Sequence, residues 1–337
     1  MLSAARLRTL PSGRGLTRNA AVCTPDLESF SVTTEPFPDK PASVAVQSVL
    51  YNNSLPSLIK ALEALDNSAL VGKRELMASR VVSVLGDASG APLLDEPTLA
   101  SLREQFSNLD EIVYVYFGEN SGTSRGHNRL AELADTDFIV TSNPDVIADA
   151  RALWRMVAAF NDPTVGMVEA KQLPVEHPKD YAAHTGATGW ATTAFAMTRR
   201  SLFEQLEGFD AQTFFMYCDD VDYSWRVREA GYTVVFHAAA IVFHDKQLTA
   251  RGKWMATGAE HFYSAQASLL LAHKWSRDDE VDRILAIFEE SERDEQRAAA
   301  AEFKERRDAG LLVAQRDADG QVGEFVGNFY TEHRYGL

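Results

Sequence analysis

Short apolar segments alternate with amphipathic ones along the chain from about residue 43 onward. Leu58, Ile59, Leu62 and Leu65 share one face of a predicted helix, Leu55–Leu70, and further helices are predicted after Ser124 and after Ile147. The apolar stretches predict four strands, Ser43–Tyr51, Arg80–Leu85, Ile112–Phe117 and Phe138–Thr141. Such alternation indicates βαβ units and an α/β fold with a mostly parallel sheet, covered by helices on both faces.

The second half of the chain is less regular. Thr185–Met197 is rich in small residues and predicts a loop that leads into a buried strand, while Asp219–Ala230 predicts a helix. Strands are expected at Tyr232–Phe236 and at Ala240–Phe243. Beyond Trp254 the pattern is helical, because four apolar residues recur at helical spacing, Val281, Ile284, Leu285 and Phe288. The charged, Ala-rich stretch to Arg307 predicts an exposed helix that packs by one stripe on its own domain, with a homodimer contact as the alternative.

These patterns divide the chain into three predicted regions. Residues 1–42 carry several Pro, Thr and Ser without a sustained period, and predict a partly disordered leader. The first 18 residues hold four arginines and no acid, and they lack the apolar core of a secretory signal. An organelle transit peptide is the alternative to a disordered leader. Residues 43–250 form the expected main α/β domain, with halves at about 43–146 and 147–250, and residues 251–337 form a helical extension and tail.

Charge and cysteine content narrow the class of protein. The 337 residues include 33 basic and 48 acidic side chains, a formal charge of −15, which disfavours binding to nucleic acid phosphates. Cys23 and Cys218 lie far apart without metal-ligand spacing, which fits a reducing cytoplasm. The sequence contains no run of 18 or more apolar residues, so no membrane span is predicted.

Polar clusters follow the first four predicted strands. Ligands of open α/β sheets bind where the carboxyl ends of the strands converge, so these clusters are the candidate binding residues. They are Tyr51-Asn52-Asn53, Gly86-Asp87-Ala88-Ser89, Gly118-Glu119-Asn120 and Ser142-Asn143-Pro144-Asp145.

Two acidic motifs could carry chemistry, and each has a structural alternative. A strand-end carboxylate such as Asp145 can hold Mg²⁺ or Mn²⁺ near a diphosphate, although Asn-Pro pairs are also common in turns. Asp219, Asp220 and Asp222 open a predicted helix, where they can cap it or provide a general base with a raised pKa.

Two further motifs stay open on the residues alone. The glycines in Asn120-Ser121-Gly122 and Gly126-His127-Asn128 would let backbone N–H groups approach an anion, or simply begin a helix. They do not match the dinucleotide fingerprint, which disfavours a nicotinamide dehydrogenase. His244 ends a predicted strand, where a histidine can ligate a metal. On the residue alone, a hydrogen-bonded polar group is the preferred interpretation of His244, as it is of His177, His184 and His237.

Taken in order, these segments resemble the family 2 glycosyltransferases, particularly the rhamnosyltransferase-like branch, from about Ser43 to about Trp275. A block from Gly208 to His244 is similar to the family pattern GGFDE.FFMY.EDVDLCWRLR.AGY, here read as GFD, FFMYCDDVDYSWR and AGY. The upstream segments that resemble the family are Ser48–Asn52, Gly86–Ser89, Glu119–Asn128 and Asn143–Val146.

The resemblance implies an A-type glycosyltransferase fold and an inverting, metal-dependent transfer of a sugar from a nucleotide diphosphate donor. It makes Asp145 and His244 ligands of a divalent metal, Mn²⁺ or Mg²⁺, and Asp220 the general base. The donor would contact Tyr51, Asn52, Asp87, Asn120, Gly122, Gly126, Asn128 and Asn143. Acceptor-binding or supporting residues would be Asp219, Asp222, Trp190 and Trp225. The halves 43–146 and 147–250 would serve donor and acceptor.

Partners and alternatives follow from the same resemblance. The donor is expected to be a dTDP- or UDP-sugar, dTDP-rhamnose first, and the acceptor a saccharide or lipid-linked saccharide in cell-surface polysaccharide synthesis, at the inner face of the membrane. Departures are Asp219 in place of Glu, the uncharged Asn143, and a long loop at Ala91–Leu109. A catalytically silent nucleotide-sugar binder is the alternative, and the joint presence of Asp220 and Asp145 favours the enzyme. A nucleotidyltransferase would need a Gly- and Lys-rich loop that Gln47–Asn53 lacks.

Overall fold

The computed structural model describes residues 39–176, 179–245, 257–326 and 330. The chain divides into two units, Met1–Glu35 and Pro36–Leu337, and all described residues belong to the second. The predicted leader up to residue 38, His177 and the residues around Trp254 therefore lie outside the described part.

The first half of the sheet is parallel, as the alternation of strands and helices predicts. Strand β1 pairs with β2 and with β4, and β2 pairs with β3, all in parallel. Their bounds match the four predicted strands to within two residues, at Ala42–Leu50 (β1), Ala78–Asp87 (β2), Glu111–Tyr116 (β3) and Phe138–Ser142 (β4). Parallel neighbours require crossover connections, which the intervening helices provide.

The second half of the sheet is mixed, in the order β3-β2-β1-β4-β8-β6-β9-β5, with β7 on β9. Only β6 and β9 are parallel here, whereas β8 is antiparallel to β4 and β6, and β9 is antiparallel to β5 and β7. The mostly parallel prediction thus describes the first half, because β8 is reached by a loop rather than a crossover helix. The strands are Val146–Ala148 (β5), Val165–Leu173 (β6), Ala187–Thr188 (β7), Phe195–Arg199 (β8) and Thr233–His244 (β9).

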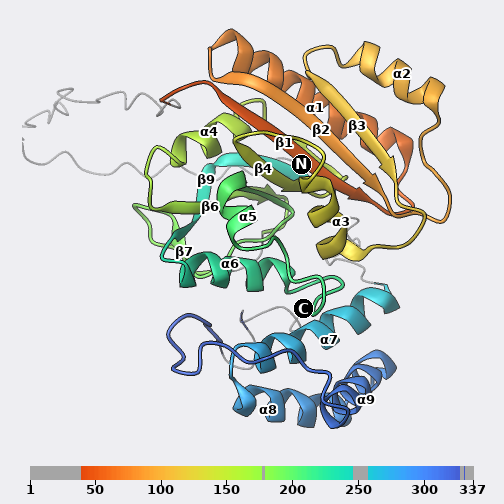
Figure 1. Ribbon diagram of the computed structural model, residues 1–337, viewed down its shortest axis with the longest axis vertical. Coiled ribbons are helices and arrows are strands. Elements are labelled where there is room, and N and C mark those ends of the chain that lie inside the picture. The colour runs from red at the N-terminus through yellow and green to blue at the C-terminus, as the bar shows by residue number, and fades with distance from the viewer. Residues whose placement is uncertain (1–38, 177–178, 246–256, 327–329, 331–337) are drawn as a thin grey trace, which may run out of the picture. The chain divides into compact units, whose positions relative to one another are not determined.

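Helices cover both faces of the sheet (Figure 1). On one face Val44, Val46 and Val81 pack with apolar residues of α1, α2 and α4. On the other, Ala45 and Val82 pack with α3, and further along Ile139 packs with α5 and α6. The helices are Leu55–Arg74 (α1), Glu96–Gln105 (α2), Gly122–Ala131 (α3), Ala152–Ala159 (α4), Arg200–Gln205 (α5) and Asp219–Glu229 (α6).

Local chemistry fixes where these helices begin and how closely they pack. Ser54 caps α1 by accepting a hydrogen bond from the backbone N–H of Ser57, and Asp95 caps α2 through Thr98. Helix α2 lies inside the segment that the sequence suggested was a long loop. A Cβ at Gly72 of α1 would lie 2.1 Å from the ring of Trp154, so only glycine lets α4 approach this closely.

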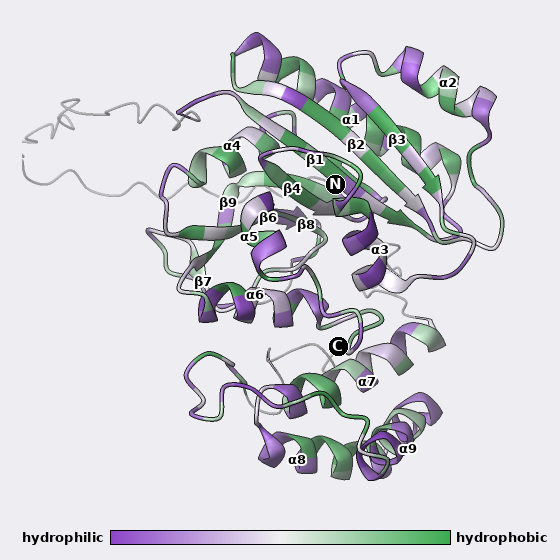
Figure 2. Cartoon of the chain, viewed as in Figure 1, coloured by the Kyte–Doolittle hydropathy of each residue, from purple (hydrophilic) through white to green (hydrophobic). Residues whose placement is uncertain are grey.

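A helical region follows the sheet, as predicted, and its first helix is tied to α6 through Lys274. Its helices are Gly258–Lys274 (α7), Asp278–Glu289 (α8) and Asp294–Asp308 (α9), and Figure 1 shows them beyond α6 from the sheet. Thr257 and Glu260 form a capping box at the start of α7. Figure 2 shows α9 mostly hydrophilic, and its apolar stripe of Ala299, Ala300 and Phe303 is buried. The one-stripe packing predicted for this helix is confirmed.

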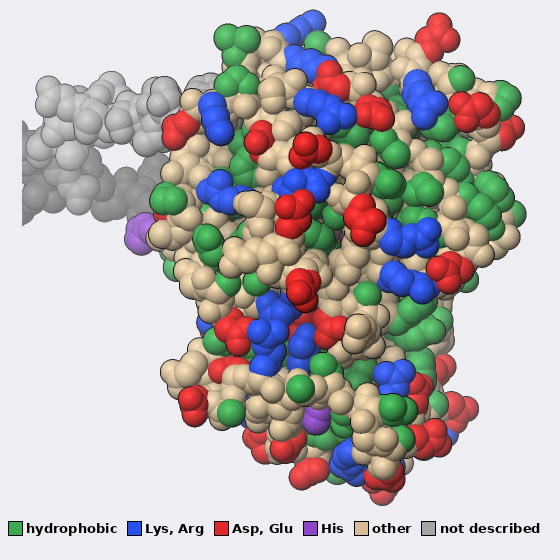
Figure 3. Space-filling model, in the orientation of Figure 1, with side chains coloured by type: hydrophobic (Ala, Val, Ile, Leu, Met, Phe, Trp, Pro, Cys, Tyr) green, Lys and Arg blue, Asp and Glu red, His purple; other side chains and the backbone are tan. Residues whose placement is uncertain are grey.

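Surface properties agree with the composition. Figure 3 shows acidic and basic side chains interspersed over one face of the molecule, without a continuous basic patch there. Among the described helices, none has the length and apolarity needed to cross a membrane.

Candidate active site

The strand directions bring most of the predicted site to one edge of the sheet. Strands β1, β2 and β4 run the same way, two antiparallel steps through β8 restore this direction in β6, and β9 follows β6 in parallel. Residues after β1, β2 and β4 therefore share the carboxyl edge with His244, the last residue of β9. This is the edge at which α/β sheets bind ligands.

Asp87 organises the loop after β2. Its carboxylate accepts hydrogen bonds from the backbone of Ser89 (2.9 Å) and Leu93 (2.7 Å) and from the Tyr114 hydroxyl (2.6 Å). Burial alone would raise the pKa of Asp87, but these hydrogen bonds outweigh it and the pKa lies below its usual value. Burial and the bond to Asp87 raise the pKa of Tyr114 to about 12. Asp87 is fully buried, so in this structure it positions the loop rather than facing solvent.

The loops after β1 and β2 are joined directly. The backbone N–H of Asn52 donates to the Ser89 hydroxyl at 2.8 Å, and Asn52 adopts a left-handed conformation with φ of 55°. Tyr51 is 54% exposed beside it, so its ring is accessible to a ligand. The structure thus brings Tyr51, Asn52 and the Asp87 loop together at the carboxyl edge, where a nucleotide was predicted.

Asp145 and His244 meet across the ends of β5 and β9. The Asp145 Oδ1 atom lies 3.2 Å from His244 Nε2, and the Asn143 side-chain nitrogen lies 3.3 Å from the same atom. Pairing of Val146 with His244 in the sheet holds these segments side by side. His244 is buried, whereas the Asp145 side chain is 32% exposed. The predicted pair of metal ligands is therefore adjacent, with its carboxylate toward solvent.

The donor set of this pair fits a divalent cation. A carboxylate oxygen and an imidazole nitrogen are suited to Mn²⁺, while the amide of Asn143 adds no charge. In the described part of the chain, no group of three or more His, Cys, Asp or Glu residues could hold a metal ion. Asp145 and His244 would therefore supply two ligands, leaving the remaining positions for donor phosphate oxygens and water.

The start of α6 holds two aspartates of different character. Asp219 is buried and accepts hydrogen bonds from the hydroxyls of Thr123 (2.8 Å) and Ser124 (3.0 Å) in α3. Burial, followed by the charge of Asp220, raises the pKa of Asp219 to about 6. Asp220 is half-buried, and the N–H of Val221 donates to its carboxylate. Neither Asp219 nor Asp222 caps the helix, because the N-cap residue is Cys218.

The loop between β7 and β8 connects the metal pair with α6. The N–H of Asn143 donates to the carbonyl of Ala194 at 2.9 Å, and the N–H of Ala191 donates to the Ser224 hydroxyl at 3.0 Å. That hydroxyl in turn donates to the carbonyl of Asp220 at 2.7 Å. One short loop therefore fixes the Asp145 segment relative to the first turn of α6.

Three of the residues predicted as acceptor-binding or supporting lie inside the protein. Asp222 is fully buried and binds Arg226, Lys274 and the Trp275 indole N–H, which ties α6 to α7. Trp225 is fully buried in the same junction, with ring centroids 5.2 Å from Trp275. Trp190 is 5% exposed and packs edge-on against Tyr330. Their burial fits a supporting role and leaves little surface for an acceptor to contact.

The motif around α3 also has a packing explanation. A Cβ at Gly122 would lie 2.2 Å from the carbonyl of Phe215, and one at Gly126 would lie 2.6 Å from Val49. The N–H of Gly122 is bound by the Asn120 side chain, and Asn120 itself is exposed.

Asn128 also binds within the chain. Its side chain accepts from the N–H of Phe209 and donates to the Phe209 carbonyl, both at 2.8 Å. Gly122, Gly126 and Asn128 therefore have packing or hydrogen-bonding roles within the chain, whereas Asn120 is exposed.

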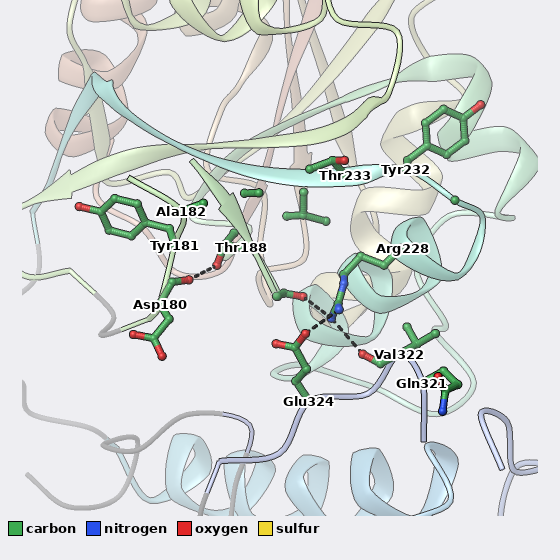
Figure 4. A pocket seen from close by; sticks show the side chains of 14 residues that line it. Asp180, Tyr181, Ala182, Thr188, Arg228, Tyr232, Thr233, Gln321, Val322 and Glu324 are labelled. Carbon is green, nitrogen blue, oxygen red and sulfur yellow. Dashed lines mark hydrogen bonds and ion pairs between the residues drawn. The ribbon is translucent and has the colours of Figure 1, made fainter. Parts of the chain in front are cut away.

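A separate surface pocket of about 540 Å³ lies away from these residues. It is formed by β7, the end of α6 and the segment around Val322, and contains none of the predicted site residues. In Figure 4, Arg228 reaches toward Glu324 and the Val322 carbonyl, with which it forms an ion pair and a hydrogen bond. Its cation is thus engaged in holding the C-terminal segment.

Sequence reasoning missed a buried polar chain that ends at His244. The Nδ1 atom of His244 lies 2.9 Å from Gln172 Oε1, and Gln172 donates to the Thr192 hydroxyl at 2.8 Å. Thr192 donates to Glu169 at 2.9 Å, and Glu169 is paired with Lys179. Burial raises the pKa of Glu169, against the opposing effect of Lys179. The available signal was a charged residue inside the apolar run VGMVEA, where unpaired charges are costly.

The sheet order and the site at its carboxyl edge define an A-type glycosyltransferase fold. Two solved structures share it. One is the mannosyltransferase PcManGT from Pyrobaculum calidifontis, in complex with GDP-Man and Mn²⁺, with a TM-score of 0.54 and 19% sequence identity. The alignment covers 82% of this chain and 78% of the PcManGT chain. GalNAc-T7 with UDP, GalNAc and Mn²⁺ has a TM-score of 0.58 at 12% identity, covering 80% of this chain and 55% of its own. The predicted fold is confirmed.

Within this class, the chain is similar to rhamnosyltransferases of the family 2 type, as its motifs predicted. It is 28% identical over 157 residues to the O-antigen chain rhamnosyltransferase RfbN of Salmonella typhimurium, 39% of this chain and 49% of the relative. It is 28% identical over 191 residues to rhamnosyltransferase WbbL of Escherichia coli K12, 45% of this chain and 72% of the relative. Against RfbN and the Salmonella anatum enzyme WbaN, the chain spans about half the relative's length. No family model matches the chain.

Proposed function

We propose that this protein transfers a sugar, with inversion, from a nucleoside diphosphate donor to a hydroxyl acceptor in the synthesis of a cell-surface polysaccharide. The observation that carries the proposal is the pairing of Asp145 with His244 at the carboxyl edge, connected by the Trp190–Ala194 loop to Asp220. The rhamnosyltransferase relatives support rhamnose as the sugar. A dTDP- or UDP-linked donor is what the resemblance of the sequence motifs implies.

Each group has a distinct part in a single displacement. Asp220 takes the proton of the acceptor hydroxyl as its oxygen bonds to the anomeric carbon, and the bond from that carbon to the diphosphate breaks. One carboxylate suffices, because no covalent glycosyl-enzyme forms. Asp145 and His244 would hold Mn²⁺ or Mg²⁺, which supplies neutralisation of the leaving diphosphate. Tyr51, Asn52 and the loop ordered by Asp87 would hold the nucleoside.

The acceptor is proposed to be a saccharide, lipid-linked if the chain works at the inner face of the cell membrane. A homodimer stays a prediction. The second candidate function is a catalytically silent binder of nucleotide sugars, which the family resemblance alone equally permits. The half-buried Asp220 favours the enzyme, because a binder needs no base at the first turn of α6.

The test is calorimetric titration of a nucleotide and nucleotide-sugar panel with Mn²⁺, repeated with a chelator. We expect one nucleoside diphosphate to bind in a metal-dependent manner, which names the donor class. Sugar transfer or donor hydrolysis is then measured with that donor. Binding without either reaction would support the silent binder, and no binding under any condition would reject both.

A further inference from the structure

The polar chain behind His244 begins at an ion pair that lies in the protein interior. The side chains of Glu169 and Lys179 are 0% and 3% exposed. The Lys179 ammonium lies 4.0 Å from the centroid of the Trp190 ring, which it faces as a cation. Replacing a buried pair of charges by apolar residues is often neutral for stability, so stability alone is a weak reason for this pair.

The direction of every hydrogen bond in this chain follows from the ion pair. A carboxylate only accepts, so the single hydroxyl proton of Thr192 goes to Glu169 Oε1. The Thr192 oxygen then accepts from the Gln172 amide nitrogen, and this turns the Gln172 carbonyl oxygen toward His244. Since a carbonyl oxygen also only accepts, the proton of neutral His244 is on Nδ1 and the lone pair is on Nε2.

The Nε2 lone pair is directed at the predicted metal position. The Asn143 amide nitrogen, which can only donate, lies 3.3 Å from Nε2 and is matched by a lone pair there, and the Asp145 carboxylate lies 3.2 Å from the same atom. The opposite tautomer would present an N–H there, which cannot ligate a cation. Orienting a ligand histidine through its other ring nitrogen is a general way to tune a metal site.

A change of strand register brings together the members of this polar chain, Glu169, Thr192 and Gln172, which we call the relay. Residues three apart in a regular strand point to opposite faces, yet Glu169 and Gln172 both bind Thr192. The pairing of β6 with β9 shifts between Ala170 and Lys171, directly between them. Such irregularities re-aim side chains next to functional sites.

We propose that Glu169, Thr192 and Gln172 are positioning residues, held by Lys179, which fix His244 in the tautomer that can ligate a metal. This inference rests on the proposed function for the use of the tautomer, but the tautomer itself is a property of the metal-free chain. The Glu169–Lys179 ion pair fixes the direction of the Thr192 hydroxyl, and the hydroxyl in turn fixes the orientation of the Gln172 amide.

The experiment compares Thr192→Val with Thr192→Ser in ¹⁵N-histidine-labelled, metal-free protein at a pH where His244 is neutral. Valine preserves the shape but removes the hydroxyl, whereas serine retains it. In the native chain and in Thr192→Ser, we expect the ¹⁵N shifts of His244 to show the proton on Nδ1. In Thr192→Val we expect a mixture of both tautomers, because the Gln172 amide can then turn over. A proton on Nε2 in the native chain, or unchanged shifts in folded Thr192→Val, would overturn the relay.

A second measurement links the relay to the metal. Mn²⁺ binding, followed by electron paramagnetic resonance in the presence of UDP, dTDP or GDP, should weaken about 10- to 100-fold in Thr192→Val and little in Thr192→Ser. Equal Mn²⁺ affinity of the native chain and Thr192→Val would overturn the role of the relay at the metal. If the native chain bound no Mn²⁺ with any nucleotide, the proposed metal role would fail, and the tautomer shifts would still decide the relay.

Discussion

Two acid-rich regions of this protein use the same residue type in opposite ways. At the α6–α7 junction, Asp222 binds Arg226, Lys274 and Trp275 and is fully buried. At the carboxyl edge, Asp145 is 32% exposed and faces a single histidine nitrogen. Asp220 and Asp222 are two positions apart, yet one is half-buried and the other closed within the core. Saturation of a carboxylate by internal donors distinguishes a support of the fold from a candidate for chemistry.

The comparison predicts its largest effect at Asp220. Asp220→Asn should lower the transfer rate by about 10²- to 10⁴-fold, because the amide cannot accept the acceptor proton. Donor affinity should stay unchanged, since the asparagine side chain has nearly the shape of aspartate and the proposed donor contacts lie elsewhere. Rates are measured with the donor identified by titration, and substantial residual transfer would remove Asp220 from the role of base.

The opposite result is expected two residues further along. Asp222→Asn should lower the free energy of unfolding by about 3–5 kcal/mol, because Lys274 and Arg226 lose a buried counter-charge. Urea unfolding measures this loss, and the activity of the molecules that remain folded should be retained. An Asp222 variant as stable as the native chain would break the distinction between the two regions.

A smaller effect is expected at the metal pair. Asp145→Asn should weaken Mn²⁺-dependent binding of the nucleoside diphosphate by at least about tenfold, because the anionic ligand is lost. Binding measured with a chelator should be the same in both proteins. Asp149→Asn is the matched control, since Asp149 is a half-exposed acid just beyond β5 that is paired with Arg155. Equal metal-dependent affinity in all three proteins would exclude Asp145 as a ligand.

The smallest effect concerns the pH dependence of stability. Asp219 has a pKa of about 6 in the folded state, above the value of about 3.9 for an unfolded Asp. The folded state therefore binds more protons between these values, and the contribution of Asp219 to stability is lost as the pH rises from about 4 through 6. Asp219→Asn should flatten this part of the profile of unfolding free energy against pH, and an unchanged slope would argue against the raised pKa.

The sequence predicted the parallel half of the sheet better than the mixed half. Strands β1 to β4 are apolar runs separated by helices, so periodicity alone locates them. Strand β6 carries Glu169 and Gln172, whose polarity hid it, and β5 is only three residues long. The prediction of α4 after Ile147 was correct in type, but β5 comes first.

The structure brings predicted site residues together where a motif and a strand end coincide, as at Asp145 and His244. Burial cannot be read from a motif, so the sequence left Asp222 and Trp225 as acceptor-binding or supporting residues, and both lie in the core. Gln172 and Thr192 were missed because their role depends on contacts between segments twenty residues apart, which neither periodicity nor composition reports.

The register shift in β9 also has a geometric consequence for the chain path. Strands β4 and β5 are separated by three residues in sequence, yet β8, β6 and β9 stand between them in the sheet. A flat sheet would hold β4 and β5 about 19 Å apart, whereas the connecting chain spans at most about 14 Å. The sheet must therefore curl at this end, and the three residues that β9 gains over β6 between His237 and Ile241 provide the slack for that curl. The curl lets the short Asn143–Asp145 segment reach β5, and the pairing of β5 with β9 then places Asp145 beside His244.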